Sequence, residues 1–206
     1  MADFSWSDAL ERTGAGKPGE TFLEAADLHV RVVDAAQIAI ACHLDPGTSA
    51  PPGTLADALA AVTGHALPLV PNTRSGDDDQ YTVWLEPARW LFISAGSGRW
   101  PRLRALQRAV ATGASPVAAA DDMSDGLAML DLAGARAPAL MAMASALDFE
   151  AAASAPPRTA RAAFAGVGAL VYRHGTGFRA HVDAALIAHV RLWLEQAARL
   201  LPRDRR

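Results

Sequence analysis

"YTVWLEPARWLFIS", residues 81–94, is the stretch that decides the fold. Two apolar runs flank the tetrapeptide EPAR at 86–89, whose composition suits a type I turn with proline at its second position. The stretch therefore predicts a β-hairpin. Pairing Leu85 with Trp90 places Trp84 and Trp90 on opposite faces, and both faces are apolar. Such a hairpin needs cover on both sides, either from layers of its own chain or, on the Trp84 face, from a partner protein.

The hairpin belongs to an order of elements that occurs twice. Alternation, helical spacing and turn residues predict a strand, a helix, a hairpin and a second helix in each half of the chain. Two β-α-β-β-α units predict an α+β protein, with mixed or antiparallel sheets that carry helices on their outer faces. The predicted elements are 37–44, 54–62, 81–95 and 101–111 in the first half, and 126–134, 136–147, 167–182 and 184–200 in the second, with a further strand at 159–164.

Composition sets the predicted boundaries. Residues 1–25 are polar, rich in glycine and without a period, so we expect a flexible arm. The first unit is predicted over 26–112 and the second over 113–202, followed by a tail at 203–206. The two units are expected to pack together and could share their sheets as one globular body. Pro, Gly and Asp dominate the segment 67–79, which predicts connecting structure only.

Several helix ends carry signals. Thr54 is a candidate N-cap for the helix at 54–62, and Gly64 follows its end. Asp183 is a candidate N-cap for the last helix, which is predicted to bury one apolar stripe and to carry ion pairs on another face. The stripe comprises Leu186, Val190, Trp193, Ala197 and Leu201, and the charged residues are Arg191, Glu195 and Arg199.

Charge and composition exclude several classes of protein. The net charge is −3 and Lys17 is the only lysine, so the basic excess of a nucleic-acid binder is absent. Cys42 is the only cysteine, which excludes an internal disulfide and fits a reducing compartment. The first 20 residues lack the pattern of a secretory signal, so we expect none, and no apolar run reaches the roughly 20 residues of a membrane span. We therefore expect a cytoplasmic protein that binds neither nucleic acid nor membrane.

Residues that could carry chemistry do not form a recognisable site. No two histidines have the spacing of metal ligands on a helix, so no metal site is predicted. Cys42 lies in an apolar strand and is predicted to be a small buried side chain rather than a nucleophile. The glycine-rich stretches 14–19 and 96–100 lack the spacing of a phosphate or dinucleotide loop. The histidines are His29, His43, His65, His174, His181 and His189.

The remaining clusters are predicted to be structural. Three aspartates at 77–79 lack the alternating ligands of a calcium loop and are expected to form a solvated turn. A group of arginines is expected to form a solvated or salt-bridged face rather than an RNA site, and four methionines are expected to fill the core. These are Arg99, Arg102, Arg104 and Arg108, and Met123, Met129, Met141 and Met143. We predict no catalytic, cofactor-binding or metal-binding residue in this chain.

An ordered set of motifs carries a family resemblance. "LPLVPNTRSG" at 67–76, followed by "VWLEPARWLFIS" at 83–94, resembles the "LP…PNT…G…WLGPDEWLL" pattern of the gamma subunit of heterotetrameric sarcosine oxidase. The stretch 122–172, which begins "DMSDGLAMLDLAG", and the closing "GFRAHVDAALIAHVRLWLEQAA" at 177–198 are similar to later parts of the same family. The resemblance covers roughly 27–200, and its specificity lies in the order of the motifs.

The resemblance implies both a fold and a role. The fold would be related to the folate-binding domain of the aminomethyltransferase of glycine cleavage. The chain would lie beside the alpha subunit in an alpha-beta-gamma-delta complex that oxidises sarcosine to glycine and passes the methyl carbon to tetrahydrofolate or releases it as formaldehyde, with formation of hydrogen peroxide. FAD, FMN, NAD and tetrahydrofolate would belong to partner subunits, and gamma would have no chemistry of its own.

Two departures from the family pattern leave alternatives open. The segment 143–146 replaces a Lys-Gly-Cys sequence, and 156–158 reads Pro-Pro-Arg in place of Pro-Pro-Gly. The first departure counts against the related folate protein of tRNA modification and iron–sulfur maintenance. Both are compatible with the gamma subunit of a dehydrogenase for another N-methyl amino acid.

Two further hypotheses come from other classes of protein. A stand-alone folate-dependent one-carbon enzyme would need carboxylates in one cavity, and a homo-oligomeric protein of unrelated role would need none. The candidate carboxylates all have a simpler explanation as turn, strand-end or surface residues. They are Glu86, Asp131, Asp148 and Glu150.

Overall fold

The computed structural model describes residues 19–25, 27–44, 48, 50–96, 99–112, 117–149 and 158–201. These residues form an α+β fold with two antiparallel sheets, which confirms the predicted fold class. The chain divides into two compact units, one around each sheet. We call them the five-stranded unit and the six-stranded unit.

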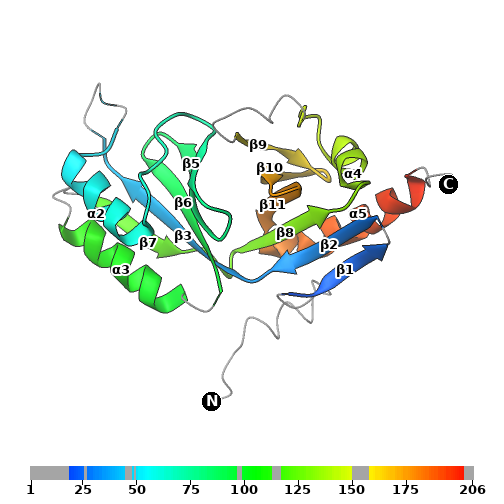
Figure 1. Ribbon diagram of the computed structural model, residues 1–206, viewed down its shortest axis with the longest axis horizontal. Helices are drawn as coiled ribbons and strands as arrows, with labels where there is room; N and C mark the ends of the chain where they lie inside the picture. Colours follow the sequence, from blue (N-terminus) through cyan, green and yellow to red (C-terminus); the bar gives the residue numbers. More distant parts are fainter. Residues whose placement is uncertain are drawn as a thin grey trace, which may run out of the picture. The chain divides into compact units, whose positions relative to one another are not determined.

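The five-stranded unit has the strand order β4-β5-β6-β3-β7. Helices α2 and α3, cyan and green in Figure 1, lie side by side against its sheet. Apolar side chains from both helices and from the facing side of the sheet form one core. Its elements are β3 (Ala35–Cys42), α2 (Gly53–Thr63), β4 (Arg74–Gly76), β5 (Gln80–Glu86), β6 (Arg89–Ala95), α3 (Arg99–Thr112) and β7 (Ala118–Asp122).

The six-stranded unit has the strand order β1-β2-β8-β11-β10-β9. Helices α4 and α5 contact each other and share one core with alternate residues of the strands. Its elements are β1 (Thr21–Ala25), β2 (Leu28–Val33), β8 (Leu127–Ala133), α4 (Ala137–Ala144), β9 (Thr159–Phe164), β10 (Val167–His174), β11 (Gly177–Asp183), the short 3-10 helix η2 (Ala184–Leu186) and α5 (Ile187–Leu200).

The predicted repeat is present, but the units are not consecutive halves of the chain. Each sheet contains a β-α-β-β-α series, which is β3-α2-β5-β6-α3 in one and β8-α4-β10-β11-α5 in the other. The first strand of each series has equivalent neighbours: β3 lies between β6 and β7, and β8 lies between β11 and β2. However, β2 pairs with β8 and β7 pairs with β3. The strand that precedes each series is therefore built into the other sheet, and the division at 112/113 does not describe the structure. Alternating side chains reveal a strand but not its partner, so this exchange could not be predicted from the pattern of residues.

The hairpin β5-β6 has a register one residue away from the predicted one. Trp84 pairs with Trp90, so the two tryptophans lie on the same face and not on opposite faces. The shift arises because Leu85 is an extra residue between the pairs Trp84–Trp90 and Glu86–Arg89. A bulge of this kind moves every side chain of one strand relative to the other.

The chain itself covers both faces of the hairpin. Trp90 and Phe92 join the core with α2 and α3, and Trp90 Nε1 donates a hydrogen bond of 2.8 Å to the Pro68 carbonyl. Trp84 is half-buried beside the same core. The face that carries Trp84 and Trp90 is therefore covered by helices of the same unit. The buried side chains of the opposite face are Tyr81, Val83, Leu91 and Ile93.

Most of the elements that were not predicted from the sequence are short strands. Strand β1 lies inside the expected arm at 1–25 and pairs with β2, while β4 lies inside the segment expected to be only connecting structure. Residues 1–18 of the arm and the tail at 203–206 lie outside the described residues. A strand of three to five residues carries too little alternation to stand out beside glycine and proline.

Helix ends were predicted better than helix faces. Gly64 ends α2 with a φ of 78°, but Pro52, and not Thr54, occupies the N-cap. Asp183 accepts a hydrogen bond of 2.8 Å from the Ala185 amide and so caps η2. The predicted pair Arg191–Glu195 is present at 2.9 Å. The buried stripe of α5 differs in part from the predicted one: Val190 and Ala197 are buried as predicted, but Ile187 and Leu194 take the places of Leu186 and Trp193.

A substitution in the hairpin turn tests its geometry. Ala88 has a φ of 65° at the third turn position, which is typical of a type II turn and not of the predicted type I. Ala88→Gly should raise the free energy of unfolding by about 1 kcal/mol, because glycine adopts positive φ without steric cost. Urea unfolding measures the change.

Ala61→Gly provides a control of opposite sign. Ala61 is exposed within α2, where glycine should lower the free energy of unfolding by about 0.5–1 kcal/mol. If both variants lose stability equally, the left-handed turn is not present in solution.

Candidate functional site

A row of polar side chains crosses the face of the six-stranded sheet opposite its helices. The strand register places Arg31 of β2 beside Asp131 of β8, Asp131 beside Arg179 of β11, and Arg179 beside Tyr172 of β10. Side chains alternate along each strand, so these four share a face while their sequence neighbours enter the core. The row therefore alternates positive, negative and positive charge across three adjacent strands.

Asp131 is clamped between two arginines. Arg179 Nε donates to Asp131 Oδ1 at 2.6 Å and Arg179 Nη2 to Oδ2 at 3.2 Å, while Arg31 Nη2 donates to Oδ2 at 3.0 Å. Burial alone would raise the pKa of the Asp131 carboxyl, but the hydrogen bonds and charge of Arg179, and then of Arg31, outweigh burial and lower it. Asp131 is therefore an ionised structural partner and is poorly suited to act as a general base.

A buried histidine lies next to this row. His181 of β11 is fully buried, and a hydrogen bond of 2.6 Å joins its Nε2 to the hydroxyl of Tyr172. Burial, followed by the positive charge of Arg179, lowers the pKa of His181 from 6.5 to about 3. The imidazole is therefore neutral at physiological pH and serves as a hydrogen-bonding group inside the sheet.

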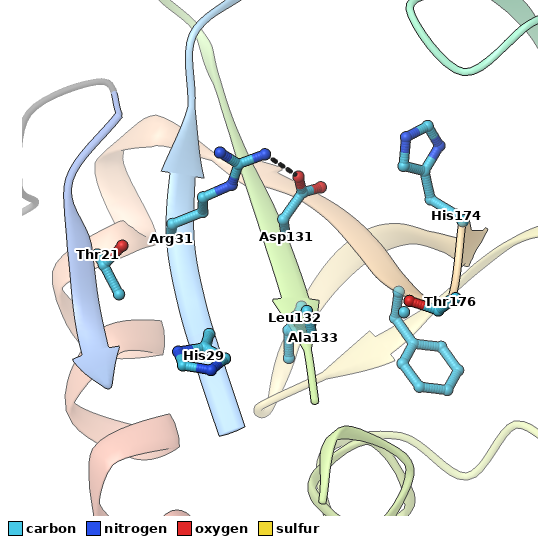
Figure 2. Close-up of a pocket in the computed structure, with 11 residues that line it drawn as sticks. Thr21, His29, Arg31, Asp131, Leu132, Ala133, His174 and Thr176 are labelled. Atoms are coloured by element: carbon cyan, nitrogen blue, oxygen red, sulfur yellow. Dashed lines mark hydrogen bonds and ion pairs between the residues drawn. The ribbon is translucent and has the colours of Figure 1, made fainter. Parts of the chain in front are cut away.

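An open pocket of about 470 Å³ lies beside the clamp. The next row of the sheet has His29 opposite Ala133 on one side and His174 opposite Gly177 on the other. Two small residues thus separate two histidines, which leaves a hollow between them. Figure 2 shows Arg31 reaching toward Asp131 above His29, with His174 at the end of its strand. The rest of the lining comes from Thr21, Leu132, Gly175, Thr176 and Phe178.

Gly177 is required by the close approach of two strands. A Cβ at this position would collide with the Leu132 carbonyl oxygen and would lie 3.3 Å from the Ala133 Cα. The absence of a side chain at Gly177 therefore permits the β8–β11 pairing and also keeps the floor of the pocket low.

The structure places the histidines apart from one another and leaves Cys42 half-buried rather than buried. The described residues contain no group of three or more potential metal ligands. His65 contacts the Thr82 hydroxyl at 2.9 Å, and His189 contacts the Ala165 carbonyl at 3.1 Å, so both have structural partners. Cys42 is half-buried at the end of β3, where burial raises the pKa of its thiol and disfavours the nucleophilic thiolate.

The charged clusters are structural in the part of the chain that is described. Asp77 accepts hydrogen bonds from the amides of Asp79 and Gln80 at 2.9 and 2.7 Å, which makes the aspartate run a turn. Arg99 pairs with Asp122 at 2.5 Å, whereas Arg104 and Arg108 are exposed on α3. Met129 and Met141 fill the core as predicted, but Met123 and Met143 are exposed.

The four candidate carboxylates do not share a cavity among the described residues. Glu86 pairs with Arg89 across the hairpin turn at 3.0 Å, as expected, and Asp148 is exposed. Glu150 lies outside the described residues, as do Gly14–Pro18 and residues 97–98 of the two glycine-rich stretches. Only Asp131 lines the pocket, and both of its oxygens are already bonded to arginine.

The sequence reading missed Arg31 and Arg179. Both lie in strands that alternate apolar residues with polar ones, "LHVRVV" and "GFRAHVD". A polar residue at every second position of two strands indicates a shared polar face. This signal was present in the sequence, but the pairing of β2 with the β8–β11 pair was needed to bring the two arginines to the same carboxylate.

Removing the charge of Asp131 should destabilise the chain. Asp131→Asn leaves the buried Arg179 guanidinium without its counter-charge, so we expect the free energy of unfolding to fall by about 3–5 kcal/mol. Asp121→Asn is the matched control, because Asp121 is exposed on β7 and its loss should change stability by no more than about 0.5 kcal/mol. Equal urea midpoints for the two variants would contradict a stabilising clamp.

The buried histidine should make stability depend on pH. Between pH 6.5 and about 3 the unfolded chain binds a proton at His181 that the folded chain excludes, so acidification favours unfolding. The contribution is up to about 1.4 kcal/mol per pH unit. His181→Gln should reduce the slope of unfolding free energy against pH between 6.5 and 4.5, whatever its absolute stability.

His43→Gln is the control for this slope, because His43 is exposed and lies in the other sheet's unit. It should leave the slope unchanged. Identical slopes for the original chain and for His181→Gln would show that His181 is not excluded from protonation in the folded state.

Comparisons with known proteins agree with this fold. No family model and no curated protein sequence matches the chain. Among solved structures, a chain of heterotetrameric sarcosine oxidase from Corynebacterium sp. U-96, in complex with pyrrole 2-carboxylate, matches with a TM-score of 0.72 and 21% identity; the match covers 97% of this chain and 96% of that one. Glycine cleavage system aminomethyltransferase T from Bartonella henselae matches with a TM-score of 0.59 and 13% identity, over 92% of this chain and 49% of that one.

The match with the aminomethyltransferase is partial. The chain spans about half the length of the aminomethyltransferase. None of the helices in the described ranges has the length and apolar character to cross a membrane. The chain therefore has the fold of a sarcosine oxidase chain, which is also the fold of about half of an aminomethyltransferase.

Proposed function

We propose that this chain is the gamma-type, non-catalytic subunit of a heterotetrameric complex of the sarcosine oxidase type. The observation that carries the proposal is the end-to-end match with one chain of such a complex, 97% of this chain against 96% of that one. The ordered motifs between 67 and 198 support the same assignment. By contrast, the match with the aminomethyltransferase leaves half of that enzyme without a counterpart.

The chemistry of the described residues supports a non-catalytic role. An aminomethyltransferase-like enzyme would need an available carboxylate inside a cavity. Among the described residues, Asp131 is the only carboxylate that lines the pocket, and it is paired with two arginines; Glu86 is paired at an exposed turn. Asp131, Arg179 and Arg31 thus link three adjacent strands of the six-stranded sheet.

Within the proposed complex, this chain would stabilise the assembly beside the alpha subunit. Alpha, beta and delta would be its partners, and FAD, FMN, NAD and tetrahydrofolate would bind to those subunits. The reaction would be the oxidative demethylation of sarcosine to glycine in the cytoplasm, with folate-linked release of the methyl carbon. A complex that acts on another N-methyl amino acid would use the chain in the same way.

Co-expression tests the assignment. The chain, carrying an affinity tag, is produced together with candidate alpha, beta and delta subunits, and we expect the purified complex to contain all four and to show flavin absorbance and sarcosine oxidation. Leu130→Asp places a charge in the core of the six-stranded unit and should abolish recovery of the complex. Recovery of the chain alone, free of flavin, would contradict the proposal, and tetrahydrofolate binding by the isolated chain would favour a stand-alone enzyme.

A further inference from the structure

The pocket beside the arginine clamp has an unbalanced charge. Among the described residues, Arg31 and Arg179 both pair with the carboxylate of Asp131, so this carboxylate cannot balance both guanidinium charges. Arg179 is almost completely buried, with a side-chain exposure of 7%, whereas Arg31 has an exposure of 56%. The excess positive charge is therefore accessible at Arg31, on the pocket side of the clamp.

Arg31 has hydrogen-bonding capacity left after it has bonded Asp131. A guanidinium offers five N–H donors, and one bond from Arg31, from Nη2 to Asp131 Oδ2, is formed within the described residues. Asp131 holds the side chain across the strands, so little rotamer freedom remains to be lost when a ligand binds. The geometry of a guanidinium suits a carboxylate, which can accept two parallel N–H bonds.

The other residues that line the pocket indicate what kind of ligand it can hold. Ala133 and Gly177 form a low floor without polar side chains. His29 and His174 lie on either side of that floor and can donate or accept hydrogen bonds. An apolar floor beside one cation fits an anion that has a hydrocarbon part better than it fits a fully hydrated ion such as inorganic phosphate.

We propose that this pocket is a binding site for a small organic carboxylate. The carboxylate contacts the Arg31 guanidinium, and its apolar body lies over Ala133 and Gly177 between the two histidines. The site belongs entirely to the six-stranded unit. It does not depend on the proposed complex, because every lining residue comes from this chain.

Titration of the full-length chain tests the site. Benzoate is the probe, measured by calorimetry and by saturation-transfer NMR at low ionic strength, with neutral benzamide as the isostere. We expect saturable 1:1 binding of benzoate with a dissociation constant of roughly 1 mM, and binding of benzamide that is at least about tenfold weaker. Failure of benzoate to saturate, or equal binding of benzamide, would overturn the proposal. Stronger binding of inorganic phosphate than of benzoate would also overturn it.

Variants assign the binding to Arg31. Arg31→Gln should weaken benzoate binding about tenfold or more, and Arg31→Lys, which keeps the charge but loses the planar fork, should give an intermediate value. Arg104→Gln removes the same charge from an exposed position on α3 and should bind benzoate as the original chain does. Equal losses in Arg31→Gln and Arg104→Gln would reduce the effect to net charge and overturn the site.

A charge of opposite sign provides a second check that does not rely on losing affinity. Glu24 of the edge strand β1 lies opposite His29 in the strand register, and its side chain is exposed. Glu24→Gln removes a negative charge next to the pocket and should strengthen benzoate binding, by up to about threefold at low salt. Weaker binding in this variant would contradict an anion site. Unchanged circular dichroism and thermal midpoints ensure that each variant is folded.

Discussion

The exchange of one strand between two repeated series is the constraint on which the rest of the structure depends. A single residue, Asp34, separates β2 from β3, yet the two strands belong to different sheets. Buried strands must have their backbone groups paired, and here β8 finds one neighbour in β2 while β3 finds one in β7. Neither half of the chain can therefore complete a sheet from its own strands. The clamp around Asp131 is complete only because β2 pairs with β8, which places Arg31 beside Asp131.

What the sequence could predict follows from the range of the interactions. Hairpins and helices are specified by nearby residues, and the elements at 53–63, 80–95, 99–112 and 167–183 lie within a few residues of their predicted places. The register of the hairpin depends on one bulged residue, Leu85, and a 3-10 turn lies where the sequence predicted the first turn of the last α-helix. Such local irregularities shift whole faces without a clear compositional sign.

The candidate site was harder to predict because its parts are distant in sequence. Asp131 was interpreted as a turn, strand-end or surface residue, whereas it lies at the centre of a clamp. Its two partners lie 100 and 48 residues away, and polar alternation in their strands marks a shared face without identifying the contact. Histidine spacing in the sequence did not show that His29 and His174 flank the same hollow. Likeness of fold leaves such questions open, because related folds carry different sites.

Gly177 ties the hollow in this sheet to the integrity of the sheet itself. A larger residue there would fill the floor, but it would also push β11 away from the Leu132 carbonyl. A substitution at Gly177 that fills the cavity therefore also lowers the stability of the fold. Selection for a stable fold is enough to keep glycine, and with it the cavity, at this position. A cavity maintained for structural reasons is available to any lineage before it has a use. Recruitment of a ligand would then require changes only around its rim.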